Sequence, residues 1–190
     1  MTGPQAAAVM IGASAGAVEA LSTILPGLPP DFPRAVIVVV HVPPDRKSVL
    51  APIFDQKCRM RAVEAEDKEP IRPGTIYFAP PDYHVLIERE GTIALSNEEM
   101  VFFSRPSIDV SFESAADAWG EAVTGIILSG ANQDGARGLR AICDAGGTAL
   151  IQDPQDAYAA AMPEAALRLC PEAHVMTLAG IGAYLQGMKQ

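Results

Sequence analysis

The chain has 190 residues, 49% of them hydrophobic, and a formal net charge of −9 at pH 7. This length and apolar content predict one folded domain over residues 1–190, and they exclude a largely disordered chain. The acidic balance, with at most the two neighbouring basic residues Arg46 and Lys47, argues against binding through nucleic-acid phosphates. The longest apolar runs, such as residues 35–42, have the length of a strand and fall far short of a membrane span.

The cysteines and the start of the chain indicate a compartment. Cys58, Cys143 and Cys170 are odd in number and widely spaced, which argues against a disulfide framework or a zinc site. We interpret them as small buried or half-buried side chains in a reducing environment. No charged and then apolar leader opens the sequence, so we expect a cytoplasmic protein without membrane insertion.

Apolar runs typical of buried strands alternate with helical patterns along the chain. The expected strands cover residues 9–11, 35–40, 125–129 and 148–151, and the expected helices cover residues 18–25, 48–57, 108–119, 136–145 and 163–169. The strands are nearly continuous in Val, Ile, Leu and Ala, as in a parallel sheet that is covered on both faces. The sequence therefore predicts an α/β fold of the doubly wound type, with a mainly parallel sheet and helices on both faces.

The middle of the chain has a different pattern. Residues 74–79 and 85–88 are short extended runs followed by turn residues, and the second turn leads into another run at 92–95. This spacing is typical of a β-hairpin. We therefore expect a small β-hairpin excursion at one edge of the main sheet and no second domain.

The first strand ends in a G-x-S-x-G pattern, Gly12-Ala13-Ser14-Ala15-Gly16, and a helical stretch follows at once. A sharp turn between strand and helix raises a serine hydroxyl at the carboxyl edge of the sheet. The N-terminus of the helix adds free N–H groups and a partial positive charge that suit a developing oxyanion. Small residues at such a turn also serve ordinary packing or a phosphate loop, so the pentapeptide alone leaves these roles open.

A serine becomes a strong nucleophile when an imidazole takes its proton and a carboxylate orients that imidazole. Among the three histidines, His41 follows the expected strand 35–40 and therefore belongs to the same sheet edge as Ser14. A histidine at a strand end can instead donate to a nearby carbonyl, but the shared edge favours a catalytic base. We expect His84 and His174 in loops, where His84 could line a cleft.

The candidate acid is Asp134, which follows the expected strand 125–129 and precedes another helix. An aspartate at this position also suits a helix N-cap, and the sequence alone leaves the two roles open. The resulting chain order is serine, histidine, acid. Ordinary α/β-hydrolases have the order serine, acid, histidine, with several strands before the nucleophile, so this chain is not expected to have that fold.

Several stretches in a fixed order resemble the catalytic domain of CheB-type chemoreceptor protein-glutamate methylesterases, over roughly residues 7–180. The matching stretches are Ile11-Gly12-Ala13-Ser14-Ala15-Gly16 with Glu19-Ala20-Leu21, Val38-Val39-Val40-His41-Val42-Pro43-Pro44, Pro73-Gly74-Thr75-Ile76-Tyr77-Phe78-Ala79-Pro80, Arg105-Pro106-Ser107-Ile108-Asp109, residues 130–138, Ala145-Gly146-Gly147 with Gln152-Asp153, and Ala161-Met162-Pro163. Together they are far more specific than any one motif.

The resemblance implies a parallel-sheet α/β domain with a catalytic triad of Ser14, His41 and Asp134. It implies hydrolysis of glutamate γ-methyl esters on the cytoplasmic helices of chemoreceptors, often with deamidation of receptor glutamines. The oxyanion would be held by the backbone N–H groups of Ala15 and of Ala131 or a neighbour. No metal or organic cofactor is needed. The family's enzymes commonly carry a phosphoryl-receiver domain, and because this sequence has none, a separate receiver protein acting in trans is one expected partner.

The sequence departs from the family pattern at three places, and the first is Val40, since the residue before the histidine is commonly glutamine. The usual Ser-Thr-Gly-Gly is Ser14-Ala15-Gly16-Ala17, and the usual Gly-Met-Gly-x-Asp-Gly has Ala131 and Asn132 in place of methionine and the second glycine. These changes affect the candidate oxyanion donors, so two other functions stay open. One is a serine esterase or amidase with another substrate, and the other is a catalytically weak signalling or interaction module. A nucleotide-binding module ranks last, since the G-x-G-x-x-G spacing and the Walker lysine are absent.

Overall fold

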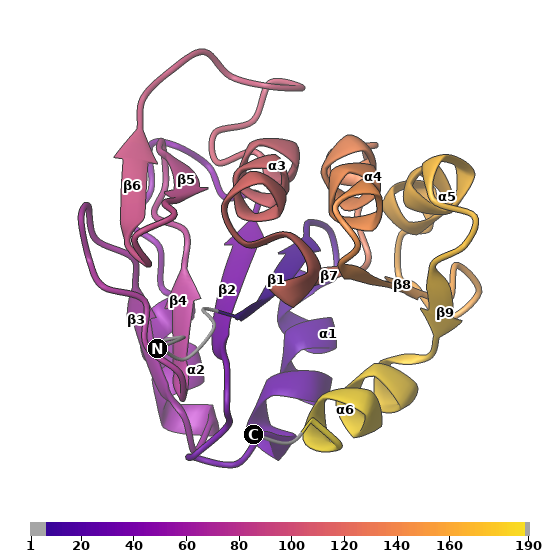
Figure 1. Cartoon of the computed structure of the whole chain (residues 1–190), viewed down its shortest axis with the longest axis horizontal. Helices are drawn as coiled ribbons and strands as arrows, with labels where there is room; N and C mark the ends of the chain where they lie inside the picture. The colour runs from indigo at the N-terminus through magenta and orange to yellow at the C-terminus, as the bar shows by residue number, and fades with distance from the viewer. Residues whose placement is uncertain (1–6, 189–190) are drawn as a thin grey trace.

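The computed structural model describes residues 7–188. Its main sheet has seven strands in the order β3-β4-β2-β1-β7-β8-β9, and all neighbouring strands are parallel. The strands are β1 (Ala8–Ala13), β2 (Ala35–Val40), β3 (Arg61–Glu64), β4 (Thr75–Phe78), β7 (Val123–Ile127), β8 (Thr148–Gln152) and β9 (His174–Met176), with a separate antiparallel pair β5 (His84–Ile87) and β6 (Ile93–Ser96). Strand β1 is therefore central, with β2 on one side and β7 on the other (Figure 1).

Helices cover both faces of this sheet (Figure 1). The helices are α1 (Ala17–Ile24), α2 (Leu50–Lys57), α3 (Ile108–Trp119), α4 (Ala136–Asp144), α5 (Ala161–Leu169) and α6 (Leu178–Gln186). Helices α3, α4 and α5 lie on one face, and α1, α2 and α6 lie on the other. The doubly wound α/β fold is thus confirmed.

The two apolar cores follow from the alternation of side chains along each strand. On β1, Met10 packs into the core beneath α3, α4 and α5, whereas Val9 and Ile11 pack into the core beneath α1, α2 and α6. On β2, Ile37 and its alternate neighbours follow the same rule. Each buried side chain of this size contributes about 1.5–3 kcal/mol, so the continuous apolar strands that the sequence contains are the main stabilising feature of the fold.

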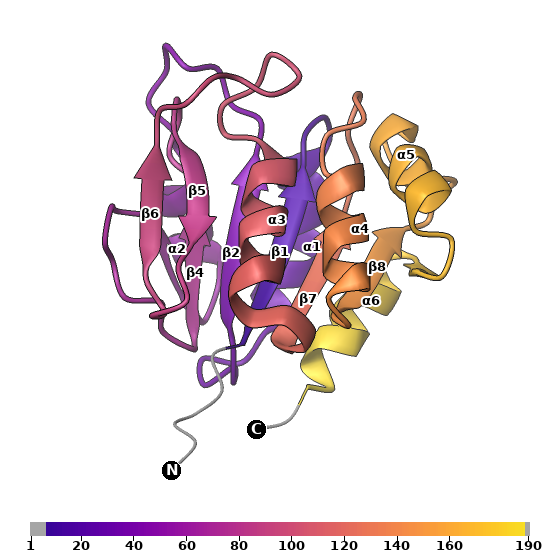
Figure 2. The same ribbon diagram turned by 45° about the horizontal axis from the view of Figure 1, so that its top comes forward.

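Four elements, β3, β4, β9 and α6, differ from the sequence prediction. Strand β4 belongs to the interior of the main sheet, between β3 and β2, and is not part of an edge excursion. Its Tyr77 can be buried because the phenol accepts from the Arg72 N–H at 3.0 Å and donates to the Pro70 carbonyl at 3.1 Å. Strands β3 and β9 and helix α6 were not expected. The expected hairpin is limited to β5 and β6, which stand beside α3 (Figure 2).

The cysteine prediction is wrong in one respect. A disulfide joins Cys143, near the end of α4, to Cys170, directly after α5. The two helices are neighbours on the same face of the sheet, so the fold brings together cysteines that are 27 residues apart. Cys58 is free and half-buried, and burial raises the pKa of its thiol to about 11. Within residues 7–188, no helix is long and apolar enough to span a membrane.

Candidate active site

The G-x-S-x-G turn joins the end of β1 to the start of α1. Gly16 has φ +82° and forms the N-cap of α1, a left-handed conformation that glycine adopts without steric cost. The Ser14 N–H donates to the carbonyl of Ser129 at 2.9 Å, and the Ser129 hydroxyl donates to the carbonyl of Ala15 at 2.7 Å. These bonds attach both sides of the turn to the end of β7, so Ser14 has a fixed backbone position at the carboxyl edge.

His41 lies next to Ser14 at this edge because β1 and β2 are in register. Ala13 pairs with Val40, the last residues of the two strands, so Ser14 and His41 are the next residues along neighbouring parallel chains. The His41 N–H also donates to the Ala13 carbonyl at 3.3 Å. The side chain of His41 is 12% exposed and can therefore be reached from solvent.

Asp134 binds the far nitrogen of the His41 ring. The distance from His41 Nε2 to Asp134 Oδ2 is 2.7 Å, and the Asp134 side chain is fully buried. Because the carboxylate is an acceptor, Nε2 carries a proton and the lone pair of the neutral ring is on Nδ1. The structure therefore brings His41 and Asp134 into direct contact, with Nδ1 as the nitrogen available as a base.

The carboxylate of Asp134 lies at the N-terminus of α3. It accepts hydrogen bonds from the Ile108 N–H at 2.7 Å, the Asp109 N–H at 2.9 Å and the Ser107 hydroxyl at 3.1 Å. Burial alone would raise the pKa of Asp134, but the bonds from His41 and from the two backbone N–H groups outweigh it and hold the pKa below the ordinary 3.8. Asp134 does not cap its own helix, since the N-cap of α4 is Gly135. The helix whose N-terminus it occupies is α3, which is distant in sequence.

Asn132 occupies the remaining nitrogen of the His41 ring. Its Oδ1 accepts from the Asp134 N–H at 3.0 Å, which orients the amide so that Nδ2 faces His41 Nδ1 at 3.3 Å. Within the described part of the chain, the Ser14 hydroxyl makes no hydrogen bond. The resting arrangement therefore has Asn132, and not Ser14, on the lone pair of the candidate base.

The two candidate oxyanion donors are both free. Neither the Ala15 N–H nor the Ala131 N–H donates a hydrogen bond to any residue between 7 and 188. Ala15 lies directly before Gly16, the N-cap of α1, where the helix dipole favours negative charge. Both groups therefore stay candidates for holding an oxyanion.

The sequence does not single out Ser107, which supports Asp134, and both histidines that it places in loops belong to strands. Ser107 is the N-cap of α3, and its serine immediately before a helical pattern is a signal that could have identified it. His84 is not in a loop: it is buried at the start of β5, where Nδ1 accepts from the Ser107 N–H at 3.1 Å and Nε2 donates to the Glu99 carbonyl at 2.9 Å. His174 begins the edge strand β9, also not a loop, and is exposed.

Asp109 is a second buried carboxylate in this region. Its Oδ1 accepts from the Gly138 N–H at 2.7 Å, whereas Oδ2 is buried without a partner in the described structure. Burial, together with the nearby charges of Asp134 and Glu113, raises the pKa of Asp109 to about 6, although the Gly138 bond and Arg137 oppose this. The pKa values of the two neighbouring carboxylates are thus shifted in opposite directions, and Asp134 keeps its charge at lower pH than Asp109 does.

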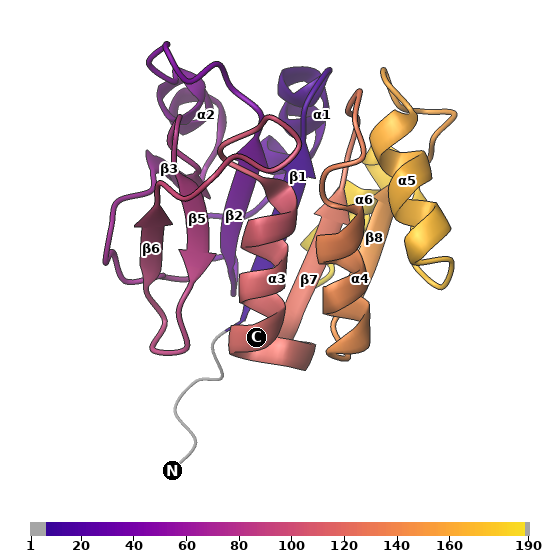
Figure 3. The ribbon, with the colours of Figure 1, turned by 90° about the horizontal axis from the view of Figure 1, so that it is seen from above.

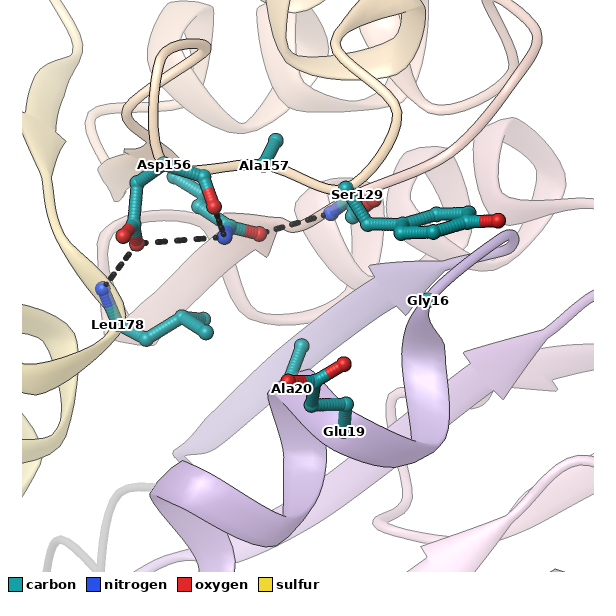
Figure 4. A pocket seen from close by; sticks show the side chains of 9 residues that line it. Gly16, Glu19, Ala20, Ser129, Asp156, Ala157 and Leu178 are labelled. Atoms are coloured by element: carbon teal, nitrogen blue, oxygen red, sulfur yellow. Dashed lines mark hydrogen bonds between the residues drawn. The ribbon is translucent and has the colours of Figure 1, made fainter.

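A cavity of about 230 Å³ lies beside the Ser14 turn (Figure 4). Its wall includes Gly16, Ser129 and the exposed Tyr158, whereas Ser14, His41 and Asp134 do not line it. A polar chain closes its far side: the Ser129 N–H donates to Gln152, and Asp156 accepts from Gln152 and from the Leu178 N–H. This cavity therefore borders the turn without containing the candidate catalytic groups.

Among the described residues, one group of side chains has the spacing of a metal site, namely Cys143, Cys170 and Glu172. The two cysteines are joined to each other, so they offer no thiolate to a metal. We therefore assign no ligand to this group.

Comparison with known proteins gives the family. A model of the CheB methylesterase family matches residues 9–185. The chain belongs to the CheB methylesterase family. The crystal structure of the Thermotoga maritima CheB methylesterase catalytic domain superimposes with a TM-score of 0.90 at 30% identity, covering 95% of this chain and 97% of that one. The family resemblance and the carboxylic ester hydrolase class are confirmed.

Relatives of CheB type differ in how much of their length the chain covers. A protein-glutamate methylesterase/protein-glutamine glutaminase of Symbiobacterium thermophilum is 38% identical, over 85% of this chain but 44% of its own length. A Leptospira interrogans relative, whose name gives the same two activities, is 43% identical over 90% of this chain and 89% of its own length. Relatives of both lengths therefore align with most of this chain.

Proposed function

We propose that this chain hydrolyses glutamate γ-methyl esters on the cytoplasmic part of chemoreceptors, with Ser14 as nucleophile, His41 as general base and Asp134 as the orienting acid. The observation that carries the proposal is the 2.7 Å hydrogen bond between His41 Nε2 and the buried, ionised carboxylate of Asp134. His41 lies beside the Ser14 turn, because Ser14 and His41 directly follow the paired strand ends Ala13 and Val40. Relatives named for protein-glutamate methylesterase activity support the substrate class.

The first chemical step forms an acyl-enzyme. His41 Nδ1 takes the proton of the Ser14 hydroxyl as Oγ attacks the ester carbonyl, and the resulting oxyanion is held by the free N–H groups of Ala15 and Ala131. The imidazolium that forms is stabilised by the Asp134 carboxylate, whose own charge is maintained by the N-terminus of α3. The tetrahedral intermediate then collapses, the C–O bond to the methoxy group breaks, and methanol leaves with the proton from His41.

The second step returns the free enzyme. A water molecule gives a proton to His41 Nδ1 and attacks the glutamyl ester of Ser14, and collapse releases the glutamate carboxyl group and returns the proton to Ser14 Oγ. A glutamine amide can enter the same cycle with ammonia as the leaving group. The glutaminase activity in the names of the relatives supports this second reaction for the present chain.

Asn132 bears on the order of events. For Ser14 to use the lone pair of His41 Nδ1, the Asn132 amide must give up its contact with that atom. We infer that the Ser14 hydroxyl takes the place of Asn132 when substrate is bound. How activity is controlled is a separate question, and a receiver protein in trans stays our proposal for it.

The two alternatives give different outcomes in one experiment. Methanol release from a methylated chemoreceptor cytoplasmic fragment is measured for the wild type, Ser14→Ala and the control Ser22→Ala, which removes a hydroxyl from the body of α1. The proposal predicts release by the wild type and Ser22→Ala and a loss of several orders of magnitude in Ser14→Ala. If the wild type hydrolyses a small ester but releases no methanol from the receptor fragment, its substrate is another ester or amide. If it hydrolyses neither the small ester nor the fragment, it is an interaction module.

A further inference from the structure

The segment between β6 and α3 displays two aromatic residues to solvent. Phe103 is 98% exposed, and Phe102 and Met100 are also exposed. In Figure 1 this segment rises beyond the helices of its layer, and Figure 3 shows it along the edge of the sheet where α1, α3 and α4 begin. Single exposed apolar residues are common, but exposed apolar residues that occur together mark interaction surfaces, and Met100, Phe102 and Phe103 lie within four residues of one another.

The segment is held firmly at its base. Arg105 donates to the carbonyls of Asn97 and Glu98, both at 2.9 Å, and pairs with Asp82 at 2.6 Å. The buried His84 binds the carbonyl of Glu99 at 2.9 Å. The exposed aromatic residues are therefore presented from a braced support.

The tip itself has an unfavourable backbone. Val101 and Ser104 exchange two hydrogen bonds of 3.1 and 2.9 Å across a two-residue turn, and the turn residues Phe102 and Phe103 have φ values of +48° and +59°. Glycine or asparagine is the usual choice for such a turn, since bulky side chains strain it. Two consecutive phenylalanines at these positions indicate that the aromatic side chains serve a function at the tip.

The tip adjoins the segment of the chain that carries Asp134. Phe102 lines a hollow of about 210 Å³ together with Gln133 and Ala136, which flank Asp134 in sequence. Arg137 and Arg168 complete the polar part of this wall. Arg137 pairs with Glu113 at 3.3 Å, and Arg168 makes no ion pair within residues 7–188. An apolar tip thus adjoins a hollow that has an available cation and is lined by residues close to Asp134 in sequence.

We propose that Phe103 and the hollow beneath Phe102 are the docking surface for the protein that carries the ester. Phe103 contacts an apolar side chain of the substrate protein, and Arg168 pairs with one of its carboxylates near the esterified glutamate. This inference rests on the proposed function for the identity of the partner. Two observations favour this occupant: the hollow is lined by Gln133 and Ala136, which lie close to Asp134 in sequence, and Arg168 is a cation that pairs with no carboxylate of residues 7–188.

Binding without turnover tests the surface independently of the chemistry. Four proteins are compared, all carrying Ser14→Ala: the parent with no further change, Phe103→Ser, Phe103→Leu and the control Tyr184→Ser. Calorimetry measures the affinity of each for a methylated chemoreceptor cytoplasmic fragment. Tyr184 is a partly exposed aromatic residue on α6, on the opposite face of the sheet. We expect Phe103→Ser to raise Kd about tenfold or more, Phe103→Leu to restore most of the affinity, and Tyr184→Ser to match the parent. Thermal unfolding midpoints equal to the parent confirm that the variants fold.

Each contrary outcome is distinct. Equal affinity of Phe103→Ser and the parent, or no binding of the fragment by the parent, overturns the docking surface. A wild type that is a dimer in light scattering and becomes a monomer on Phe103→Ser also overturns it, in favour of self-association. Vesicles of anionic lipid that bind the parent but not Phe103→Ser overturn it in favour of a membrane. Binding that depends on Phe103 without methanol release by the wild type leaves the surface standing and refutes the proposed function.

Discussion

Asp109 should make the stability of this protein depend on pH in a way that one substitution removes. Burial raises the pKa of Asp109 from 3.8 to about 6 in the folded protein. A difference of about two pH units corresponds to about 3 kcal/mol between the protonated and ionised forms. Since the folded value lies above the unfolded value, this contribution to stability is complete below pH 4 and is lost as the pH rises through 6.

The substitution Asp109→Asn removes the charge and keeps the shape. The amide oxygen can still accept from the Gly138 N–H, while the amide nitrogen takes the place of the unpartnered Oδ2. That buried donor costs about 1–3 kcal/mol at every pH, so the absolute stability of the variant is less informative than its slope with pH. We predict that the stability difference, variant minus wild type, rises by about 3 kcal/mol between pH 4 and pH 8.

Urea unfolding at pH 4, 6 and 8 measures this difference directly. Asp117→Asn is the matched control, because Asp117 is an exposed carboxylate on the same helix, and it should follow the wild type at each pH. If the curves of Asp109→Asn and the wild type run parallel from pH 4 to 8, the buried carboxyl group does not titrate as described, and the reasoning is refuted.

Three further changes test the site and the fold. Asp134→Asn should lower turnover of a methyl ester by about 10⁴-fold, since His41 then loses the acceptor that fixes its tautomer, and turnover within tenfold of wild type would contradict this. Asn132→Gly removes the hydrogen-bond donor that contacts His41 Nδ1. The reaction of Ser14 with a fluorophosphonate, a reagent for activated serines, should then become about two- to tenfold faster near pH 7, and a slower reaction would mean that the Asn132 amide assists the chemistry. Cys143→Ser should lower the free energy of unfolding by about 3 kcal/mol under non-reducing conditions and abolish the effect of a reductant, since it opens a 27-residue loop; an unchanged stability would count against the pairing with Cys170.

The sequence predicts the parts of the fold that local patterns determine. Continuous apolar runs identify β1, β2, β7 and β8, and their alternation with helical patterns predicts the doubly wound architecture. The short strands β3 and β9 are not predicted, because three or four residues, most of them exposed or half-exposed, are too few to show the apolar pattern of a strand. The sequence predicts β4 at an edge because it shows the turn residues that follow this strand but not the strands that pair with it.

The candidate site likewise has one part that local sequence patterns predict and another that depends on long-range contacts. Ser14 and His41 could be placed together because parallel strands end at one edge, and this needs no long-range contact beyond the sheet itself. The backbone donors that bind the Asp134 carboxylate could not be predicted, because they belong to the N-terminus of α3, which is 25 residues or more away in sequence. The contact between Asn132 and His41 and the disulfide between Cys143 and Cys170 likewise depend on how loops and helices pack side by side.

The nucleophile is the central claim, and covalent labelling tests it most directly. The wild type is treated with a fluorophosphonate that reacts with activated serines, and the modified residue is located by mass spectrometry. The account predicts one adduct, on Ser14, that forms far more slowly in His41→Ala and in Asp134→Asn. An adduct on another serine, or labelling of Ser14 at an equal rate in all three proteins, would contradict it.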